Sequence, residues 1–152
     1  MAVPAVGSLA PDFTMMSSDS RTVTLSQFRG KERVLLAFFP MAFTDTCTAE
    51  MRAFTAEYDL YTAAGVRVLA ISVDSVPTLK EFKAKHSLAV ELLSDYRRDV
   101  CRAYGSLDEE HFCSNRAYFQ VDREGIVRWA HVEANSGQCR SNAEIMGAIG
   151  VA

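Results

Sequence analysis

The sequence of 152 residues lacks several features that mark particular classes of protein. It has no uninterrupted apolar run of about 20 residues, the length that a transmembrane helix needs, so we expect no association with a membrane. It has no basic block, and its net charge of −3 comes from interspersed acids and bases, so we expect no nucleic-acid partner. Internal repeats, low-complexity tracts and glycine-rich phosphate-binding loops are also missing.

The sequence also lacks a C-x-x-C pair, because its four cysteines stand apart at positions 47, 101, 113 and 139. A chain of this length can bury a sufficient core without disulfides, so we expect reduced thiols, one or more of them redox-active. Residues 1–7 lack the basic and apolar regions of a secretory signal. These observations predict a cytoplasmic protein that folds as a single domain over residues 1–152.

Strand-like and helix-like patterns alternate along the chain. The predicted strands are an N-terminal hairpin near Phe13 and residues 23–25, buried strands at residues 34–39 and 67–73, a short strand at 90–93, and a hairpin of 117–121 and 126–132. The predicted helices run from Thr46 to about Ala64, from the start signal Asp74-Ser75-Val76-Pro77, and over residues 97–104. A last helix is opened by the capping box Ser141-x-x-Glu144. Parallel neighbouring strands need crossover connections, which helices supply. The order therefore predicts an α/β protein with a central mixed β-sheet flanked by helices, as in the thioredoxin-like fold.

Cys47 stands at the junction between the first buried strand and the helix that follows it. The apolar run ends at Pro40, and the helical pattern begins close to the cysteine. Unpaired backbone N–H groups and the positive end of the helix dipole face a thiol in a first helical turn, and both favour the thiolate. The position therefore suggests a reactive cysteine, although an isolated helical cysteine is more often a small buried hydrophobe.

The segment Pro40-x-x-x-Thr44-x-x-Cys47 resembles the active-site motif of the peroxiredoxins, which are thiol peroxidases on a thioredoxin fold. Further segments that resemble this family extend over most of the chain: Ala10-Pro11-Asp12-Phe13, Leu69-Ala70-Ile71-Ser72-Val73, Leu92-Leu93-Ser94-Asp95, Ala103-Tyr104-Gly105, and Arg116 followed by Phe119-x-Val121-Asp122-x-x-Gly125. The segment Phe38-Phe39-Pro40-x-Ala42-Phe43-Thr44 is most similar to the corresponding segment of the AhpE-type branch, whose best-known members use one essential cysteine.

Reduction of a peroxide by a thiolate breaks an O–O bond and builds negative charge on the departing oxygen, so the site needs hydrogen-bond donors. Thr44, one helical turn before Cys47, can offer its hydroxyl to the sulfur or to a peroxide oxygen. Pro40 would shape the loop and shield the thiolate from water. The resemblance implies that Arg116 stabilises the thiolate and polarises the peroxide, and that Glu50 orients the arginine.

Each of these residues also has an ordinary structural explanation when it is taken alone. Thr44 could be a helix cap, Pro40 a strand terminator and Arg116 a partner in a surface salt bridge. Glu50 could simply be a favourable acid near the start of a helix. Their joint spacing around Cys47 favours the catalytic interpretation over these alternatives.

The resemblance implies hydrogen peroxide and organic hydroperoxides as substrates, with peroxynitrite as a further candidate. Cys47 would become a sulfenic acid that a low-molecular-weight thiol or a thioredoxin-like or glutaredoxin-like protein reduces. It also implies a homodimer and no metal or other cofactor. Where some family members carry a resolving cysteine, this chain has Arg52, and neither the 79–85 region nor a C-terminal extension supplies another.

Three other thiols remain as possible internal partners of Cys47. Cys101 lies on the predicted apolar face of a short helix, which favours core packing. Cys113 lies in a predicted loop close to Arg116, and Cys139 lies in the polar segment 135–140. We expect a one-cysteine mechanism, with resolution by Cys139 or Cys113 as the main alternative.

Other functions are less well supported by the residue pattern. His86, His111 and His131 are dispersed, without the repeated ligand spacing of a zinc site and without a feature that marks one as the base of a Cys–His hydrolase. A dithiol–disulfide oxidoreductase would need a paired cysteine near Cys47. A redox sensor or holdase on the same fold remains an alternative to the peroxidase.

Overall fold

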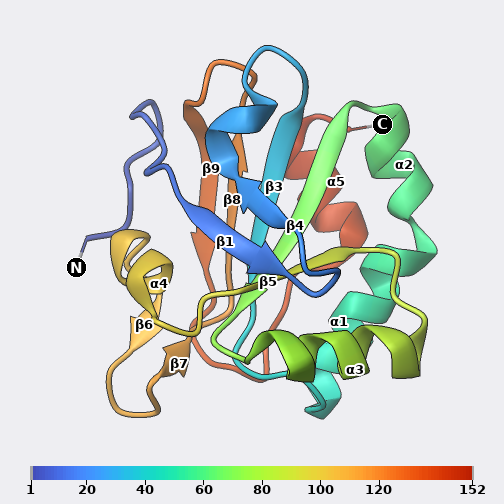
Figure 1. Ribbon diagram of the computed structural model, residues 1–152. Coiled ribbons are helices and arrows are strands. Elements are labelled where there is room, and N and C mark those ends of the chain that lie inside the picture. The colour runs from blue at the N-terminus through green and yellow to red at the C-terminus, as the bar shows by residue number, and fades with distance from the viewer. Residues whose placement is uncertain (1, 152) are drawn as a thin grey trace.

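The computed structural model describes residues 2–151. The strands are β1 (Thr14–Ser17), β2 (Thr22–Thr24), β3 (Arg33–Phe38), β4 (Val66–Ser72), β5 (Glu91–Ser94), β6 (Leu107–Asp108), β7 (Cys113–Ser114), β8 (Ala117–Val121) and β9 (Val127–Val132). The helices are α1 (Asp45–Ala56), α2 (Tyr58–Ala63), α3 (Val76–His86), α4 (Asp99–Ala103) and α5 (Asn142–Ile149), with a 3₁₀ helix at Leu25–Phe28. Figure 1 shows their arrangement.

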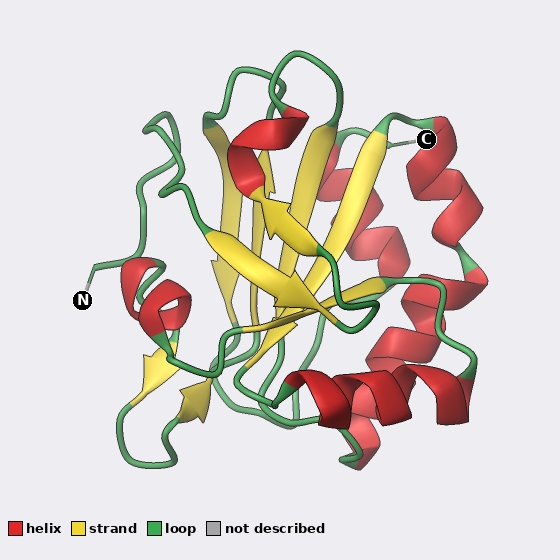
Figure 2. Cartoon of the chain, in the orientation of Figure 1, coloured by secondary structure: helices red, strands yellow, loops and turns green. Residues whose placement is uncertain are grey.

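Seven strands form one mixed sheet in the order β2-β1-β5-β4-β3-β8-β9. The central strands β3, β4 and β5 are parallel to one another, whereas β8 and β9 join the β3 side as an antiparallel hairpin and β1 and β2 form a hairpin at the other edge. Helices α1, α2 and α5 lie on one side of this sheet, and α4 lies on the other (Figure 2). The predicted thioredoxin-like fold with an N-terminal hairpin is confirmed.

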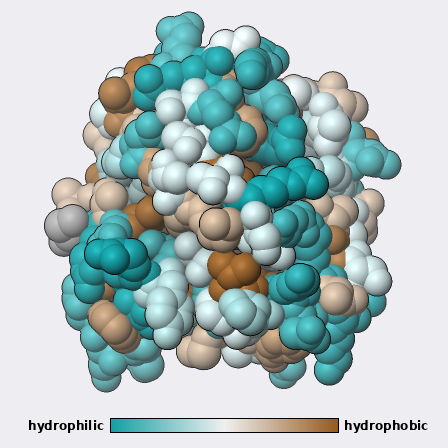
Figure 3. Space-filling model, in the orientation of Figure 1, coloured by the Kyte–Doolittle hydropathy of each residue, from teal (hydrophilic) through white to brown (hydrophobic). Residues whose placement is uncertain are grey.

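Both faces of the central strands are buried, which explains the uninterrupted apolar run in β3. Leu36 and Phe38 belong to the core beneath α4 and the N-terminal segment, and Leu35 and Ala37 belong to the core beneath α1, α2, α3 and α5. Parallel strands that are covered on both faces are typically apolar throughout instead of alternating. Hydrophilic side chains dominate the molecular face seen in Figure 3, with apolar side chains in separate small patches.

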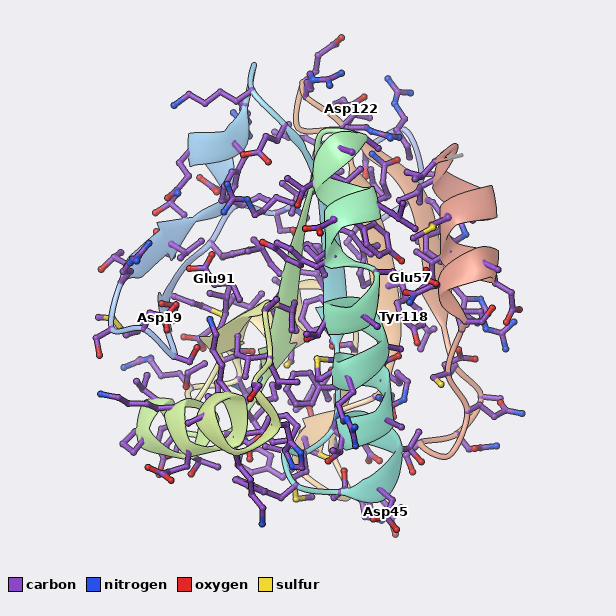
Figure 4. All side chains as sticks on the ribbon, turned by 90° about the vertical axis from the view of Figure 1, so that its right-hand side faces the viewer. Asp19, Asp45, Glu57, Glu91, Tyr118 and Asp122 are labelled. Atoms are coloured by element: carbon purple, nitrogen blue, oxygen red, sulfur yellow. The ribbon has the colours of Figure 1, made fainter. Side chains whose placement is uncertain are left out.

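The long helix predicted from Thr46 to Ala64 is wrong in one respect, because it is interrupted at Glu57. The backbone angles of Glu57 (φ −113°, ψ 18°) lie outside the helical region, so the hydrogen-bond ladder stops after α1 and restarts in α2. The two helices still follow one another along nearly the same direction (Figure 4). Their apolar residues Met51, Phe54 and Tyr61 therefore remain on one buried face.

A second difference concerns the segment that carries Cys113. This segment is not a loop, because Cys113 and Ser114 form β7, which pairs with β6 in a separate two-stranded sheet. The hydroxyls of Ser106 and Ser114 lie 2.8 Å apart and join the two ends of this hairpin. Strands of two residues are too short to show a periodic pattern, so only the tertiary pairing reveals them.

The remaining elements lie close to their predicted positions. The capping box is present, since the Ser141 hydroxyl accepts from the Glu144 N–H and the Glu144 carboxylate accepts from the Ser141 N–H. Within residues 2–151, no helix combines the length and apolar character that are needed to span a membrane.

We predict that Phe38→Ala lowers the free energy of unfolding by about 3–5 kcal/mol, because it opens a cavity among closely packed rings. Phe38 is fully buried and lies against Tyr104 and Phe119 at ring-centroid distances of 5.4 and 5.8 Å. The measurement is urea unfolding followed by circular dichroism. Leu60→Ala, at a side chain that is 48% exposed, is the control and should change stability by less than about 0.5 kcal/mol.

Candidate active site

Cys47 lies in the first turn of α1, as the sequence predicts. Thr44 is the N-cap residue with extended backbone angles, and the helix begins at Asp45, which marks the lower end of α1 in Figure 4. The first-turn N–H groups lack partners within the helix, and the positive end of its dipole lies at the sulfur. Cys47 is only 1% exposed, so the protein largely shields its sulfur from bulk water.

The guanidinium of Arg116 contacts the sulfur of Cys47. Its Nη2 donates to Cys47 Sγ at 3.2 Å and to the Ser136 carbonyl at 3.1 Å, and its Nη1 donates to Glu50 Oε1 at 2.8 Å. Sheet register brings these groups together, because β8 pairs with β3 so that Ala117 lies opposite Phe38. Arg116 therefore lies beside the segment that leads from β3 to Cys47, and the predicted association of Cys47, Glu50 and Arg116 is present.

Arg116 and Glu50 form a buried ion pair, with side chains that are 1% and 2% exposed. Burial opposes the charge on Arg116, but the carboxylate of Glu50 and the sulfur of Cys47 outweigh it and raise the pKa of Arg116. Burial also raises the pKa of Glu50, and the opposing effects of Arg116 and Tyr118 compensate only in part. Both carboxylate oxygens accept hydrogen bonds, which is the arrangement of the ionised form.

Tyr118 is a member of the site that the sequence analysis missed. Its hydroxyl donates to Glu50 Oε2 and accepts from the backbone N–H of Arg140 at 3.0 Å. Figure 4 shows the side chain beside α1. The alternation of side chains along a strand could have indicated Tyr118, because residues 116 and 118 point to the same face of the sheet. Burial and the neighbouring Glu50 raise the pKa of Tyr118, so it remains a hydrogen-bond donor at neutral pH.

The loop between β9 and α5 is tied to this network at several points. Its first part is joined to Arg116 through the Ser136 carbonyl, and its end is joined to Tyr118 through the N–H of Arg140. The side chain of Arg140 also donates to Glu133 at 2.9 Å. The loop is thus fixed over the guanidinium, a role for residues 133–140 that no sequence motif indicated.

The segment between β3 and α1 is held by Asp74, whose role the sequence analysis also missed. Asp74 Oδ2 accepts from the Ala42 N–H at 2.8 Å and from the Ser72 hydroxyl at 2.7 Å. Phe43 has a left-handed backbone (φ 68°) in this segment. These contacts fix the path of the chain between Pro40 and Thr44.

Pro40 and Thr44 both line the pocket that contains Cys47. Pro40 is buried, whereas Thr44 is exposed and donates its hydroxyl to the Met41 carbonyl at 2.7 Å. A hydroxyl oxygen can still accept while its proton is donated elsewhere. Thr44 therefore lies where a small molecule in the pocket would meet it, with its proton directed to the backbone.

A pocket of about 540 Å³ opens onto Cys47 and is called the Cys47 pocket below. It is lined by Pro40, Met41, Thr44, Asp45, Thr46, Cys47, Asp108, His111, Cys113, Ser114, Asn115, Arg116, Ala134, Asn135, Ser136 and Gly137. Arg116 Nε is buried and has no hydrogen-bond partner among residues 2–151. A polar ligand that reached the guanidinium could satisfy this donor.

Asp108 and His111 form a pair among the residues that line the Cys47 pocket. His111 Nδ1 lies 2.7 Å from Asp108 Oδ2, and this hydrogen bond raises the pKa of His111 and lowers the pKa of Asp108. Within the described chain, no three His, Cys, Asp or Glu side chains are grouped so that they could hold a metal ion. Asp108 and His111 place a hydrogen-bonded carboxylate and imidazole in the wall of the pocket.

The other three cysteines have different surroundings. Cys101 is fully buried in the core, where burial raises its pKa. Cys113 is buried and lines the Cys47 pocket, whereas Cys139 is exposed and does not line it. Burial raises the pKa of both Cys113 and Cys139.

Comparison with known proteins agrees with the fold. The sequence model of the AhpC/TSA family matches residues 6–130, and the chain belongs to this family, that of the peroxiredoxins. Among individual relatives, alkyl hydroperoxide reductase E of Mycobacterium tuberculosis is 38% identical over 130 residues, which cover 84% of this chain and 85% of the relative. Peroxiredoxin 2 of Thermoplasma acidophilum is also 38% identical over 130 residues, covering 82% of this chain and 64% of that protein.

Solved structures of peroxiredoxins share the fold of this chain. The reduced 2-Cys peroxiredoxin of Plasmodium vivax superposes with a TM-score of 0.86 at 34% identity, covering 94% of this chain and 79% of that one. AhpC of Mycobacterium tuberculosis superposes with a TM-score of 0.88 over 98% of this chain and 93% of that one. Its identity is 21%, so it shows a shared fold.

We predict that Arg116→Met lowers the free energy of unfolding by about 3–5 kcal/mol at pH 8, because it leaves Glu50 buried without its cation. The loss should be smaller at pH 5. Burial raises the pKa of Glu50, so without Arg116 the carboxyl becomes protonated as the pH falls and its desolvation cost disappears. Urea unfolding at the two pH values measures both effects.

The matched control is Arg67→Met at the partly exposed ion pair with Glu32, where the side chains are 36% and 29% exposed. This substitution should cost less than about 1 kcal/mol and show little dependence on pH in this range. Equal losses for the two variants would contradict the prediction.

Proposed function

We propose that this protein reduces peroxides with the thiolate of Cys47. The contact between Arg116 Nη2 and Cys47 Sγ, made inside an open pocket at a helix N-terminus, is the observation that supports the proposal most directly. The names of its relatives, alkyl hydroperoxide reductase and peroxiredoxin, support the same chemistry. Hydrogen peroxide and organic hydroperoxides are the proposed substrates, with peroxynitrite as a further candidate.

In the proposed reaction, Cys47 sulfur attacks one peroxide oxygen and the O–O bond breaks. The bonding electrons go to the departing oxygen, which takes up a proton and leaves as water or an alcohol, while Cys47 becomes a sulfenic acid. Arg116 stabilises the thiolate in the ground state and the negative charge on the departing oxygen in the transition state. Arg116 Nε, which has no hydrogen-bond partner within residues 2–151, and the N–H groups at the start of α1 supply donors for these oxygens.

The other predicted residues have supporting roles in this proposal. Glu50, with Tyr118, fixes the orientation of the guanidinium through hydrogen bonds to both carboxylate oxygens. Thr44 accepts a hydrogen bond from the proton-bearing peroxide oxygen, while its own hydroxyl proton is donated to the Met41 carbonyl. Pro40 forms a wall of the pocket and limits access of water to the sulfur.

The sulfenic acid needs a thiol to return Cys47 to its reduced state. An external low-molecular-weight thiol or a thioredoxin-like or glutaredoxin-like protein is the proposed reductant, because the Cys47 pocket is open to solvent. Of the two internal candidates, Cys113 borders this pocket and Cys139 does not. A single domain would then carry the peroxide-reducing step with no bound cofactor, and the reductant would come from another molecule.

We predict that Cys47→Ser abolishes peroxide consumption, because serine is not ionised at neutral pH and is a far weaker nucleophile. The reduced wild-type protein should consume about one peroxide per Cys47 in a fast first turnover, measured by stopped-flow mixing. Cys101→Ser, at a buried thiol that does not line the Cys47 pocket, is the control and should retain this turnover.

Arg116→Lys keeps a positive charge but loses the planar fork that binds Glu50 and the sulfur together, and should slow the first turnover by roughly 100-fold. A Cys47→Ser protein that reacted at the wild-type rate would refute the assignment. Slow oxidation of wild-type protein without turnover by any thiol would favour a redox sensor or holdase.

We also propose that the protein is a homodimer. Four large apolar side chains near the Cys47 pocket or its adjoining loops are exposed: Met41, Phe43, Tyr96 and Phe112, at 45%, 46%, 64% and 48%. Exposed apolar groups of this size are often covered by a partner protein.

Phe43→Glu is expected to shift the protein from dimer to monomer in sedimentation velocity, because a charge at a closed apolar contact must be desolvated. Leu60→Glu, on the distant helix α2, is the control and should leave the dimer intact. A wild-type protein that sediments as a monomer at tens of micromolar would contradict the proposal.

A further inference from the structure

Asp108 and His111 form a carboxylate–imidazole pair in the wall of the Cys47 pocket. His111 Nδ1 lies 2.7 Å from Asp108 Oδ2, so Nε2 is the ring nitrogen that remains for a ligand. The other carboxylate oxygen fixes the turn, because Asp108 Oδ1 accepts from the N–H groups of Glu110 and His111 at 2.9 and 3.2 Å. A carboxylate that holds one ring nitrogen sets the tautomer and leaves the other nitrogen as a proton acceptor, which is the geometry of a general base.

The hairpin of β6 and β7 carries this pair to the pocket (Figure 1). Asp108 pairs with Cys113 across the two strands, and both residues line the pocket. The Phe112 N–H donates to the Asp108 carbonyl at 2.7 Å and closes the turn. Arg98 holds the turn from the segment before α4, since its Nε donates to the Phe112 carbonyl at 3.0 Å and its guanidinium carbon lies 4.1 Å from the centroid of the Phe112 ring. The turn that presents His111 is therefore fixed from several sides.

His111 is accessible to a molecule that enters the Cys47 pocket. Its side chain is 67% exposed, and it lines both this pocket and a second one of about 510 Å³. Met41 and Cys113 line both pockets too, so the two adjoin. The volume of the Cys47 pocket, about 540 Å³, lies in the size range of small-ligand sites. The pocket can therefore admit an organic thiol as well as a peroxide.

A base has work to do only in the reductive half of the proposed reaction. Cys47 itself needs none, because Arg116 donates to its sulfur and favours the thiolate. An ordinary alkyl thiol, by contrast, has a pKa well above 7, so little of it is reactive thiolate at neutral pH. That thiol must lose its proton, and the hydroxyl of the sulfenic acid must gain one to leave as water.

We infer that His111, oriented by Asp108, is the general base that activates a low-molecular-weight alkyl thiol for attack on the Cys47 sulfenic acid; this rests on the proposed peroxidase function. Nε2 removes the thiol proton, the thiol sulfur forms an S–S bond with Cys47, and the S–O bond breaks. The S–O electron pair goes to the hydroxyl, which takes the proton back from His111 and leaves as water. The Cys47 sulfur is reduced to the disulfide level and the sulfur of the incoming thiol is oxidised to it. A second thiol molecule then releases Cys47 as a thiol by exchange.

The charges around His111 favour a base that works near neutral pH. The hydrogen bond to Asp108 and the charges of Asp108 and Glu110 raise the pKa of His111 above its ordinary value. A base is most effective when its pKa lies near the working pH. The other titratable or charged groups that line the two pockets are Asp45, Cys47, Asp74, Arg98, Cys113 and Arg116. As the pH falls through the pKa of His111, the imidazole becomes protonated and the assisted reaction is lost.

The test measures the reductive step by itself. Full-length reduced protein receives one equivalent of hydrogen peroxide in a sequential quenched-flow experiment at pH 7, followed by either 2-mercaptoethanol or thionitrobenzoate. The intact mass then gives the sulfenic acid that remains. 2-Mercaptoethanol is almost wholly protonated at this pH, whereas thionitrobenzoate is ionised and needs no base. We expect His111→Gln to slow the reaction with 2-mercaptoethanol roughly 100-fold and that with thionitrobenzoate less than about threefold.

The pH profile separates a base from a group that only shapes the pocket. In His111→Gln, the rate with 2-mercaptoethanol should rise about tenfold per pH unit between pH 7 and 8.5, because only free thiolate reacts. The wild-type rate should rise much less, because the assisted path depends on neutral imidazole. Asp108→Asn should also slow this reaction, since an amide does not hold the required tautomer.

His86→Gln is the matched control, at a partly buried histidine that lines neither pocket, and should react with both thiols as the wild type does. Equal rates for the wild type and His111→Gln, or equal slowing with both thiols, would overturn the inference. Loss of the wild-type sulfenic acid to an internal disulfide before the added thiol reacts would overturn it as well.

Peroxide consumption by the wild-type protein is recorded in the same experiment, so that two kinds of failure are distinguished. If the protein consumes one equivalent but its reduction does not depend on His111, the role of His111 is wrong and the peroxidase function stands. If it consumes no peroxide, the proposed function is wrong, and the role of His111 is wrong with it.

Discussion

The buried ion pair between Arg116 and Glu50 is the interaction on which the rest of the site depends. One guanidinium joins α1, β8 and the loop before α5, because it donates to Glu50, to Cys47 and to the Ser136 carbonyl. These three segments are remote in sequence, and Tyr118 of β8 also joins them, through Glu50 of α1 and the backbone N–H of Arg140. The position of the nucleophile, the charge beside it and the wall of its pocket all follow from this arrangement.

Such a pair is a costly way to stabilise a fold. Removing two charges from water carries a desolvation penalty that their attraction offsets only when the geometry is good, and apolar side chains of similar size often pack as well. Here Tyr118 satisfies the second carboxylate oxygen, and one donor, Arg116 Nε, has no partner within residues 2–151. The pair is therefore better explained by the chemistry of Cys47 than by stability.

Much of the fold could be predicted because its signals are local. The apolar run that became β3, the capping box at Ser141 and the Asp122–Gly125 turn each depend on neighbouring residues. The misses have tertiary causes. The break at Glu57 does not disturb the helical spacing of apolar residues, β6 and β7 are too short to show a period, and Asp74 meets Ala42 only because β4 ends beside β3.

The sequence by itself determined the order of the longer elements, the family and the position of Cys47 in a first helical turn. These depend on short-range sterics and backbone hydrogen bonds, which residue spacing records. Only the tertiary structure decided which remote groups surround the sulfur. Arg116 lies 69 positions from Cys47 and reaches it because β3 and β8 pair in one particular register. Likewise, Cys113 faces the Cys47 pocket and Cys139 does not, a difference set by how separate segments pack and not by their local composition.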